Sequence, residues 1–194
     1  MRIIVDKKLI LRKYKPKDKS ALYENSQDPF FIKYLEYKKF SKKQFDLWLK
    51  KKLKNKDDIF LVIEYEKKPV GTYILNISGI KKQICNLGYG ISSKYFGNKI
   101  FTKATKKILN KFSYIKKFNA ITRVDNVPSI KGLKRLKFKK EGELKSYYYD
   151  LKTKKYYNAF IFSYLRYKKW INKNMFKLIS WIFITIILIM MCVI

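Results

Sequence analysis

The sequence predicts an α/β domain, with helices on both faces of a mixed β-sheet, followed by a helix that spans a membrane. Three observations lead to this prediction. Short β-branched segments alternate with segments of helical period in the order β-α-α-β-β-β-α-β-α-β-β. Hydrophobic residues make up 47% and aromatic residues 17% of the 194 residues, which is ample for a packed core. Residues 178–194 carry no charged side chain.

The first half of the domain is expected to contain a strand, two helices and three further strands. Pro16 ends the first strand, and Asp18 caps the helix that follows. The second helix carries apolar side chains expected to lie on one side: Phe45, Leu47, Trp48, Leu49 and Leu53. The expected ranges are 9–12 for the first strand, 18–26 and 41–53 for the helices, and 59–65, 69–77 and 85–92 for the remaining strands.

The second half continues with a loop, two helices and three strands. Asn126 is expected to cap the second of these helices, with Pro128 in its first turn, where a missing N–H is harmless. The last two strands form a long aromatic hairpin. The expected ranges are 93–100 for the loop, 101–112 for the first helix, 119–124 for a strand, and 138–149 and 156–165 for the hairpin.

The net charge of +32 has two explanations. One is attraction to a polyanion, such as nucleic acid, the ribosome or anionic lipid. The other is an AT-rich genome, because lysine, isoleucine, asparagine, tyrosine and phenylalanine are all abundant. Only five of the 46 basic residues are arginine, the residue that base-reading proteins favour, so nucleic acid is not an expected partner.

The chain contains no histidine, which removes the commonest metal ligand and general base. Neither a metal site nor a Ser-His-Asp triad is therefore expected. Cys85 falls in an expected strand and Cys192 in the apolar tail, so no disulfide is expected, in keeping with a reducing compartment. No apolar run follows Met1, and we expect no signal peptide.

The apolar segment 178–194 would span about 26 Å as a helix, close to the thickness of a bilayer's hydrocarbon core. Arg166, Lys168, Lys169, Lys173 and Lys177 precede it, and by the positive-inside rule they keep the domain in the cytoplasm and favour anionic membrane lipid. The expected division is a domain over residues 1–169, a basic juxtamembrane segment over 170–177, and the membrane helix. The alternatives are a helix or strand buried within the domain, or a tail acquired by frameshift.

Five segments, in order along the chain, resemble the RimJ/RimL-type branch of the GNAT N-acetyltransferases. They are LILRKYKPKD (9–18), PVGTYIL (69–75), LGYGISSKYFGNKIFTKATKKIL (87–109), RVDNVPSIKGLKRLKFKKEG (123–142) and YYNAFIFSYL (156–165). The resemblance covers about residues 8–168 and implies the GNAT acyl-CoA N-acyltransferase fold. It also implies acetyl-CoA as co-substrate and an amine acceptor, either a protein N-terminus or a small amine.

The same resemblance places the phosphates of acetyl-CoA on the loop before the expected helix at 101, where helix N–H groups favour anions. The family pattern there is Q/R-x-x-G-x-G/A, and the matching stretch here runs from Phe96 to Phe101, with Phe96 at the first position and Phe101 at the last small one. The residues expected at the cofactor are Gly97, Asn98, Lys99, Ile100, Phe101 and Thr102. Lys99 stands where the family has glycine, and Lys137 replaces a second family glycine. A lysine at such a position costs about 1 kcal/mol if its φ is positive.

In the family, the amine attacks the thioester directly in a ternary complex, and a strand amide polarises the acyl carbonyl. The matching amide is that of Gly90 or Ile91. Asn126 and Ser129 match positions near the pantetheine and the departing thiolate, which Ser129 would protonate. The alternative roles are a helix cap for Asn126 and an ordinary first-turn serine for Ser129.

No general base is evident, since Glu64 and Glu66 fit solvated charges at strand ends. Residues 147–149 match positions that line the acceptor side of the site in the family.

Three functions compete. They are an acetyl-CoA-dependent N-acetyltransferase, a catalytically impaired anion-binding module of the same fold held at a membrane, and a ribosome- or nucleic-acid-binding protein supported by charge alone.

Overall fold

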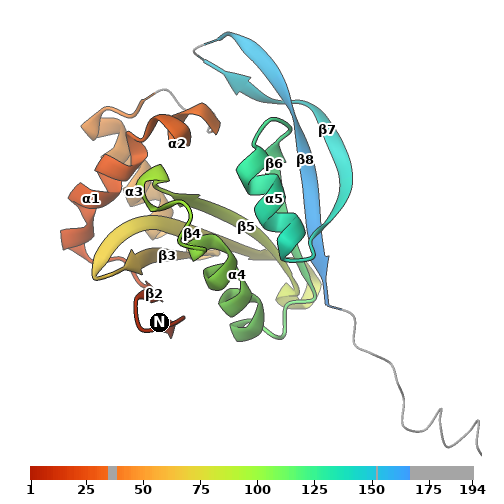
Figure 1. The fold of residues 1–194 in the computed structure, drawn as a ribbon, viewed down its shortest axis with the longest axis horizontal. Coiled ribbons are helices and arrows are strands. Elements are labelled where there is room, and N and C mark those ends of the chain that lie inside the picture. Colours follow the sequence, from red (N-terminus) through yellow and green to blue (C-terminus); the bar gives the residue numbers. More distant parts are fainter. Residues whose placement is uncertain (35–38, 152, 167–194) are drawn as a thin grey trace, which may run out of the picture.

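A computed structural model describes residues 1–34, 39–151 and 153–166, and within them eight strands form one mixed sheet in the order β1-β2-β3-β4-β5-β6-β8-β7 (Figure 1). The strands are β1 (Arg2–Ile4), β2 (Leu9–Arg12), β3 (Asp58–Tyr65), β4 (Lys68–Ser78), β5 (Ile84–Ile91), β6 (Lys117–Arg123), β7 (Lys139–Asp150) and β8 (Lys155–Leu165). The α-helices are α1 (Lys19–Ser26), α2 (Pro29–Tyr34), α3 (Lys42–Lys54), α4 (Ile100–Lys111) and α5 (Val127–Arg135).

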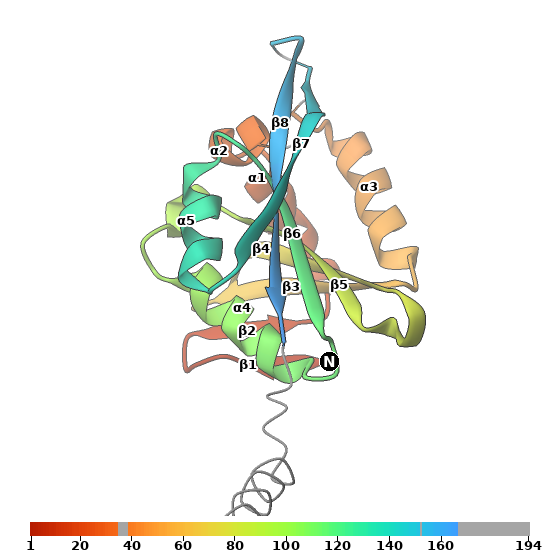
Figure 2. The ribbon, with the colours of Figure 1, turned by 90° about the vertical axis from the view of Figure 1, so that its right-hand side faces the viewer.

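Helices cover both faces of the sheet, with α4 and α5 on one face and α3 on the other (Figure 2). The central strand β3 shows why both faces are covered. Its side chains point alternately to the two faces, and both sets are apolar. Leu61 and Ile63 belong to the larger core cluster, which includes α4 and α5. Phe60 and Val62 belong to a second cluster with residues of α1 and α3.

The sheet is split between β5 and β6. These two strands are the one parallel pair of the described sheet, and they pair over three residues only, 84–86 with 117–119. Beyond that point β5 continues beside β4 as far as Ile91, and β6 continues beside β8 as far as Arg123. The far ends of β5 and β6 therefore lie apart, which leaves backbone groups unpaired and space between the strands.

Most of the expected elements are confirmed to within two residues, including Asn126 as the cap of α5, whose side chain accepts a hydrogen bond from Ser129 N–H. Strand β1 and helix α2 were not predicted. The expected apolar face of α3 was partly wrong, because Leu47 is 61% and Leu53 43% exposed. Asp18 is the N-cap residue of α1 as expected, but its side chain caps no helix N–H, because the carboxylate binds the Arg12 guanidinium at 2.7 and 2.8 Å instead.

The expected membrane segment, Cys192 and residues 170–177 lie outside the described residues. In residues 1–34, 39–151 and 153–166, no helix combines the length and the apolar character that crossing a bilayer requires.

Candidate active site

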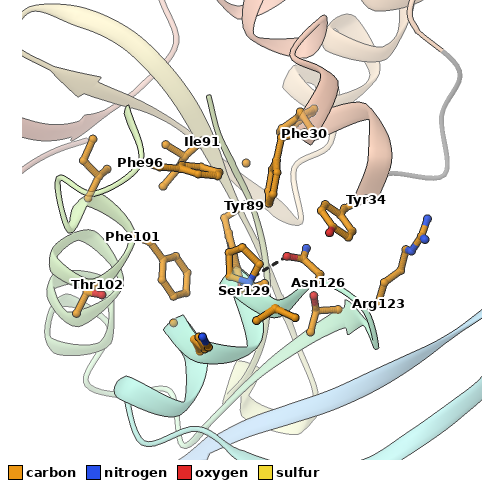
Figure 3. Close-up of a pocket in the computed structure, with 18 of the residues that line it drawn as sticks. Phe30, Tyr34, Tyr89, Ile91, Phe96, Phe101, Thr102, Arg123, Asn126 and Ser129 are labelled. Atoms are coloured by element: carbon orange, nitrogen blue, oxygen red, sulfur yellow. Dashed lines mark hydrogen bonds between the residues drawn. The ribbon is translucent and has the colours of Figure 1, made fainter. Parts of the chain in front are cut away.

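A cavity of about 970 Å³ occupies the split between β5 and β6 and is enclosed by α2, the start of α4 and the start of α5 (Figure 3). The structure brings nearly all the sequence-predicted site residues together around it: Gly90, Ile91, Gly97, Lys99, Ile100, Phe101, Thr102, Asn126 and Ser129. The exception is Asn98, which does not line the cavity. Its amide donates to the carbonyls of Tyr95 and Phe96 and so braces the loop.

The start of α4 presents free backbone donors to the cavity. The first N–H groups of a helix lack partners within the helix, and Ile100, Phe101 and Thr102 all line the cavity. Lys99 is the N-cap residue in the left-handed conformation, with φ 57° and ψ 19°, and Gly97 has φ 85°. Lys99 therefore has the positive φ at which a lysine is strained, while the free N–H groups at the start of the helix remain suited to an anion.

The charges around the cavity are all of one sign. Four basic residues line it, namely Lys99, Arg123, Lys131 and Arg135, and none of the lining residues is acidic. Arg123 is buried and paired with Asp125 at 2.9 Å and Asp150 at 3.4 Å. Lys99, Lys131 and Arg135 form no ion pair with any of the described residues. The cavity therefore favours an anionic ligand.

The direction of the backbone amides on β5 identifies the one that faces the split. Successive residues of a strand point their N–H groups to opposite edges. Ser92 N–H, just beyond the end of β5, donates to the carbonyl of Val70 in β4 at 2.9 Å. The amide of Ile91 therefore points the other way, toward the open side of the split, while that of Gly90 points toward β4. Of the two candidate amides, Ile91 is the one available to a ligand.

Two hydroxyl groups meet at the centre of the cavity. Tyr89 Oη and Ser129 Oγ lie 2.6 Å apart, and either can be the donor. Burial raises the pKa of the Tyr89 phenol to about 12, although the hydrogen bond with Ser129 acts in the opposite direction. Tyr89 therefore stays protonated near neutral pH. When it donates to Ser129, the serine hydroxyl is free to donate to a ligand.

Phe101, which replaces a small residue of the family pattern, is accommodated by a glycine on the facing helix. Its ring packs on that of Tyr89 with centroids 4.4 Å apart. A Cβ added to Gly132 on α5 would lie 2.8 Å from two atoms of the Phe101 ring. Gly132 therefore allows α5 to lie close to the Phe101 ring beside the cavity.

Of the other residues considered as bases, nucleophiles or acceptor-side residues, only Tyr148 lines the cavity. Glu64 is not a solvated charge as expected, because it accepts from Arg12 Nε at 2.6 Å in a partly buried ion pair. Glu66 pairs with Lys8 at the surface. Tyr148 lines the cavity, whereas its neighbours Tyr147 and Tyr149 are exposed. Cys85 is buried, and burial raises the pKa of its thiol to about 12.

Sequence reasoning missed the aromatic wall contributed by α2, which consists of Phe30, Phe31 and Tyr34. A signal for this helix exists in the pair Asp28-Pro29. Phe30 N–H donates to the Asp28 carboxylate at 2.9 Å, and a proline is favoured at the first helical position. Tyr89 was also missed. Its signal in the sequence is that a large side chain stands between two glycines, Gly88 and Gly90, on the same strand.

Known proteins share the fold of this chain. The family described as acetyltransferase (GNAT) domain matches residues 8–139. RimL, a ribosomal L7/L12 α-N-protein acetyltransferase solved with coenzyme A, is similar with a TM-score of 0.76 and 17% identity over 85% of this chain and 98% of that one. The microcin C7 self-immunity acetyltransferase MccE, solved with acetyl-CoA and AMP, has a TM-score of 0.74 and 22% identity over 84% and 94%.

A third similar structure is the acetyltransferase from Salmonella typhimurium that modifies the N-terminal serine of 50S ribosomal protein L7/L12. Its TM-score is 0.76, with 17% identity over 86% of this chain and all of that one. No curated protein matches the sequence significantly. The family match covers more than half of the chain. The chain belongs to the acetyltransferase (GNAT) domain family.

Proposed function

We propose that the protein transfers the acetyl group of acetyl-CoA to an amine, and that the split between β5 and β6 is where the transfer occurs. The observation that carries this proposal is the convergence of anion-binding and oxyanion-type donors on one cavity. The start of α4, with Lys99, Lys131 and Arg135, suits the phosphates of coenzyme A, and the Ile91 amide suits the thioester carbonyl.

In the proposed mechanism, the amine attacks the thioester carbon directly, and the amide of Ile91 stabilises the negative charge that develops on the carbonyl oxygen. The nitrogen loses its extra proton to water as the amide forms. The Ser129 hydroxyl donates its proton to the departing thiolate and is reprotonated from solvent, while Tyr89 holds Ser129 by donating a hydrogen bond to it. Tyr89 is thus a positioning residue, since it acts through Ser129. Asn126 caps α5 through Ser129 N–H at 3.3 Å and fixes the serine at the cavity.

The acceptor that fits this cavity is a weakly basic amine. Among the described residues that line it there is no carboxylate, and the chain has no histidine, so no side chain there is suited to take a proton from an ammonium group. An α-amino group with a pKa near 7.7–8.0 has a sizeable neutral fraction at physiological pH, whereas a lysine amine with a pKa near 10.4 is almost entirely protonated. A protein or peptide N-terminus is therefore the proposed acceptor.

The test is transfer by the full chain from acetyl-CoA to peptides, read by mass spectrometry. One peptide has a free α-amino group, and its matched control has a blocked N-terminus and an internal lysine. We expect acetylation of the first and little of the second, with a rate that rises with pH up to the pKa of the acceptor amine. Equal modification of both peptides would contradict the α-amine assignment. Absence of acetyl-CoA binding would favour the impaired anion-binding module.

We further propose that residues 178–194 hold the domain at a membrane, with the domain in the cytoplasm and the basic residues from Arg166 to Lys177 near anionic lipid. The absence of charge in that segment supports this proposal. The full chain should sediment with membranes and resist both high salt and carbonate, whereas a chain lacking residues 171–194 should stay in the supernatant. Release of the full chain by salt alone would show that the attachment is electrostatic.

A further inference from the structure

Helix α2 bridges the two separated strands of the split. At its first end, the Asp28 carboxylate accepts hydrogen bonds from Ser92 Oγ at 3.1 Å, Ser93 N–H at 2.7 Å and Ser93 Oγ at 2.8 Å, just beyond the end of β5. At its other end, Arg123 at the end of β6 donates to the Lys33 carbonyl at 2.8 Å. The helix therefore lies across the open end of the split, as Figure 3 shows for Phe30 and Tyr34.

The attachment at the second end is doubled. Tyr34 Oη donates to the carbonyl of Asp125 at 3.3 Å, and the Arg123 guanidinium lies 5.6 Å from the centre of the Tyr34 ring. Within the helix, the Phe30 ring packs against Tyr34 at 4.9 Å and against Phe96 at 4.8 Å. Because both ends are tied to the strands and its rings are packed, α2 forms a fixed wall of the cavity.

Phe31 is the residue of this wall that lies directly on β5. A Cβ built on Gly90 would come within 1.8 Å of Phe31 Cε2 and 2.5 Å of Cζ. The Phe31 ring therefore fills the space that a side chain at position 90 would take. Gly90 precedes Ile91, whose amide faces the split, so the ring stands beside the position proposed for the thioester carbonyl.

We propose that Phe31 is a specificity-determining residue that limits the acyl group to acetyl. This inference rests on the proposed function, because it assigns the acyl end of the acetyl-CoA site. With the carbonyl oxygen at the Ile91 amide, the acyl carbons extend into the space bordered by the Phe31 ring. A methyl group fits beside the ring, whereas a longer chain meets it. The Phe31 ring cannot easily move aside for a longer chain, because α2 is hydrogen-bonded to the two strands at both of its ends.

The test compares the affinity of the full chain for coenzyme A, acetyl-CoA and butyryl-CoA by calorimetry. The quantity of interest is the ratio of the butyryl-CoA Kd to the acetyl-CoA Kd. In the unmodified protein we expect this ratio to be about tenfold or more, since misfit of one or two methylenes has effects of that order. In Phe31→Ala the ratio should approach one, while the Kd for coenzyme A itself stays unchanged. Phe31→Leu should give an intermediate ratio.

Phe30→Ala is the matched control, because it removes an aromatic ring from the same helix without opening the space over Gly90. It should keep most of the selectivity of the unmodified protein, because the hydrogen bonds at both ends of α2 still hold the helix across the split. A ratio near one in the unmodified protein, or an unchanged ratio in both Phe31 variants, would overturn the inference while leaving the proposed function intact. Equal loss of selectivity in Phe30→Ala would also overturn it, because general loosening of α2 would then be the cause. If neither coenzyme A nor acetyl-CoA binds, the proposed function fails and this assignment fails with it.

Discussion

Lys99 and Lys137 occupy similar backbone conformations at two helix ends that differ in their surroundings. Both are left-handed, with φ 57° at Lys99 and 65° at Lys137, where glycine is the favoured residue. Lys99 begins α4 at the edge of the cavity, whereas Lys137 follows α5 away from it. Strain at Lys99 therefore affects both ligand binding and folding stability, whereas strain at Lys137 affects folding stability alone.

The turn at Lys137 is well built despite the lysine. Lys137 N–H donates to the Lys134 carbonyl at 2.9 Å, and Phe138 N–H donates to the Leu133 carbonyl at 3.1 Å. This is the hydrogen-bond pattern of a Schellman motif, and Leu133 and Phe138 are both buried in the larger core cluster. A lysine in the left-handed conformation is therefore tolerated where hydrogen bonds and core contacts fix the turn. It lowers the free energy of unfolding, and substitution of the lysine by glycine measures by how much.

The largest expected effect lies at the cavity end of α5. Ser129→Ala should lower kcat by about 100-fold, because a proton donated to the leaving thiolate acts only in the transition state. KM should change much less, and the melting temperature should stay near that of the unmodified protein. Steady-state kinetics with a peptide acceptor checks this. Tyr89→Phe should lower kcat less than Ser129→Ala, and a loss confined to KM in Ser129→Ala would contradict the assigned role.

Asp28 gives the next largest effect, and it depends on pH. Burial alone would raise the pKa of its carboxyl group, but the hydrogen bonds from Ser93, Phe30 and Ser92 hold the pKa below its usual 3.8. A depressed pKa contributes stability that is present above the unfolded value and lost as the pH falls through the folded value. Asp28→Asn should therefore cost about 2 kcal/mol at pH 6.

The measurement is denaturant unfolding of both proteins from pH 6 down to pH 3. The difference in unfolding free energy between the unmodified protein and Asp28→Asn should shrink below pH 4. A difference that stays constant over this range would show that the charge of Asp28 does not hold α2 across the split.

Replacing either left-handed lysine by glycine should stabilise the fold by a similar, smaller amount. Lys99→Gly and Lys137→Gly should each add about 1 kcal/mol, which raises the melting temperature by about 2–4 °C for a domain of this size. Lys99→Ala and Lys137→Ala keep the strained conformation and should show no such gain. Stabilisation at one position alone would break the comparison between the two helix ends.

The smallest expected effect belongs to Cys85, at the paired end of the split. Because its thiol is buried and its pKa is raised to about 12, it is neither a thiolate nor exposed to the cavity. Cys85→Ala should retain activity, and initial-rate lines should intersect, as direct attack in a ternary complex requires. Parallel lines, or an acetyl group on Cys85 after incubation without acceptor, would contradict the mechanism.

The longer elements of the fold could be predicted from sequence because each has its own local signal. The helix at α4 repeats apolar residues at helical spacing, and the cap at Asn126 precedes a proline at a position where one is favoured. Strand β1 has three residues and α2 six, too few for a period to show. Leu47 and Leu53 misled the prediction, since apolar character alone does not indicate which side of α3 is covered.

The candidate site was predicted as a set of positions, but its contacts were not. The resemblance identified Ser129, and nothing in the sequence indicates that Tyr89, 40 residues earlier, lies 2.6 Å from it. The choice between the amides of Gly90 and Ile91 needed the direction of one hydrogen bond, from Ser92 to Val70. Likewise, the position of Phe31 on Gly90 depends on how α2 is tied across the split, which is a tertiary arrangement.

Calorimetric titration of the full chain with acetyl-CoA tests the central claim most directly, namely that the cavity at the start of α4 binds the phosphates of this co-substrate. The unmodified protein should bind, Lys99→Gly should bind several-fold more tightly because relaxed backbone donors approach the phosphates, and Lys137→Gly should bind like the unmodified protein. Lys99→Ala, which keeps the strain and loses the charge, should bind more weakly. Absence of binding in all four proteins, or equal affinities in Lys99→Gly, Lys99→Ala and Lys137→Gly, would contradict the claim.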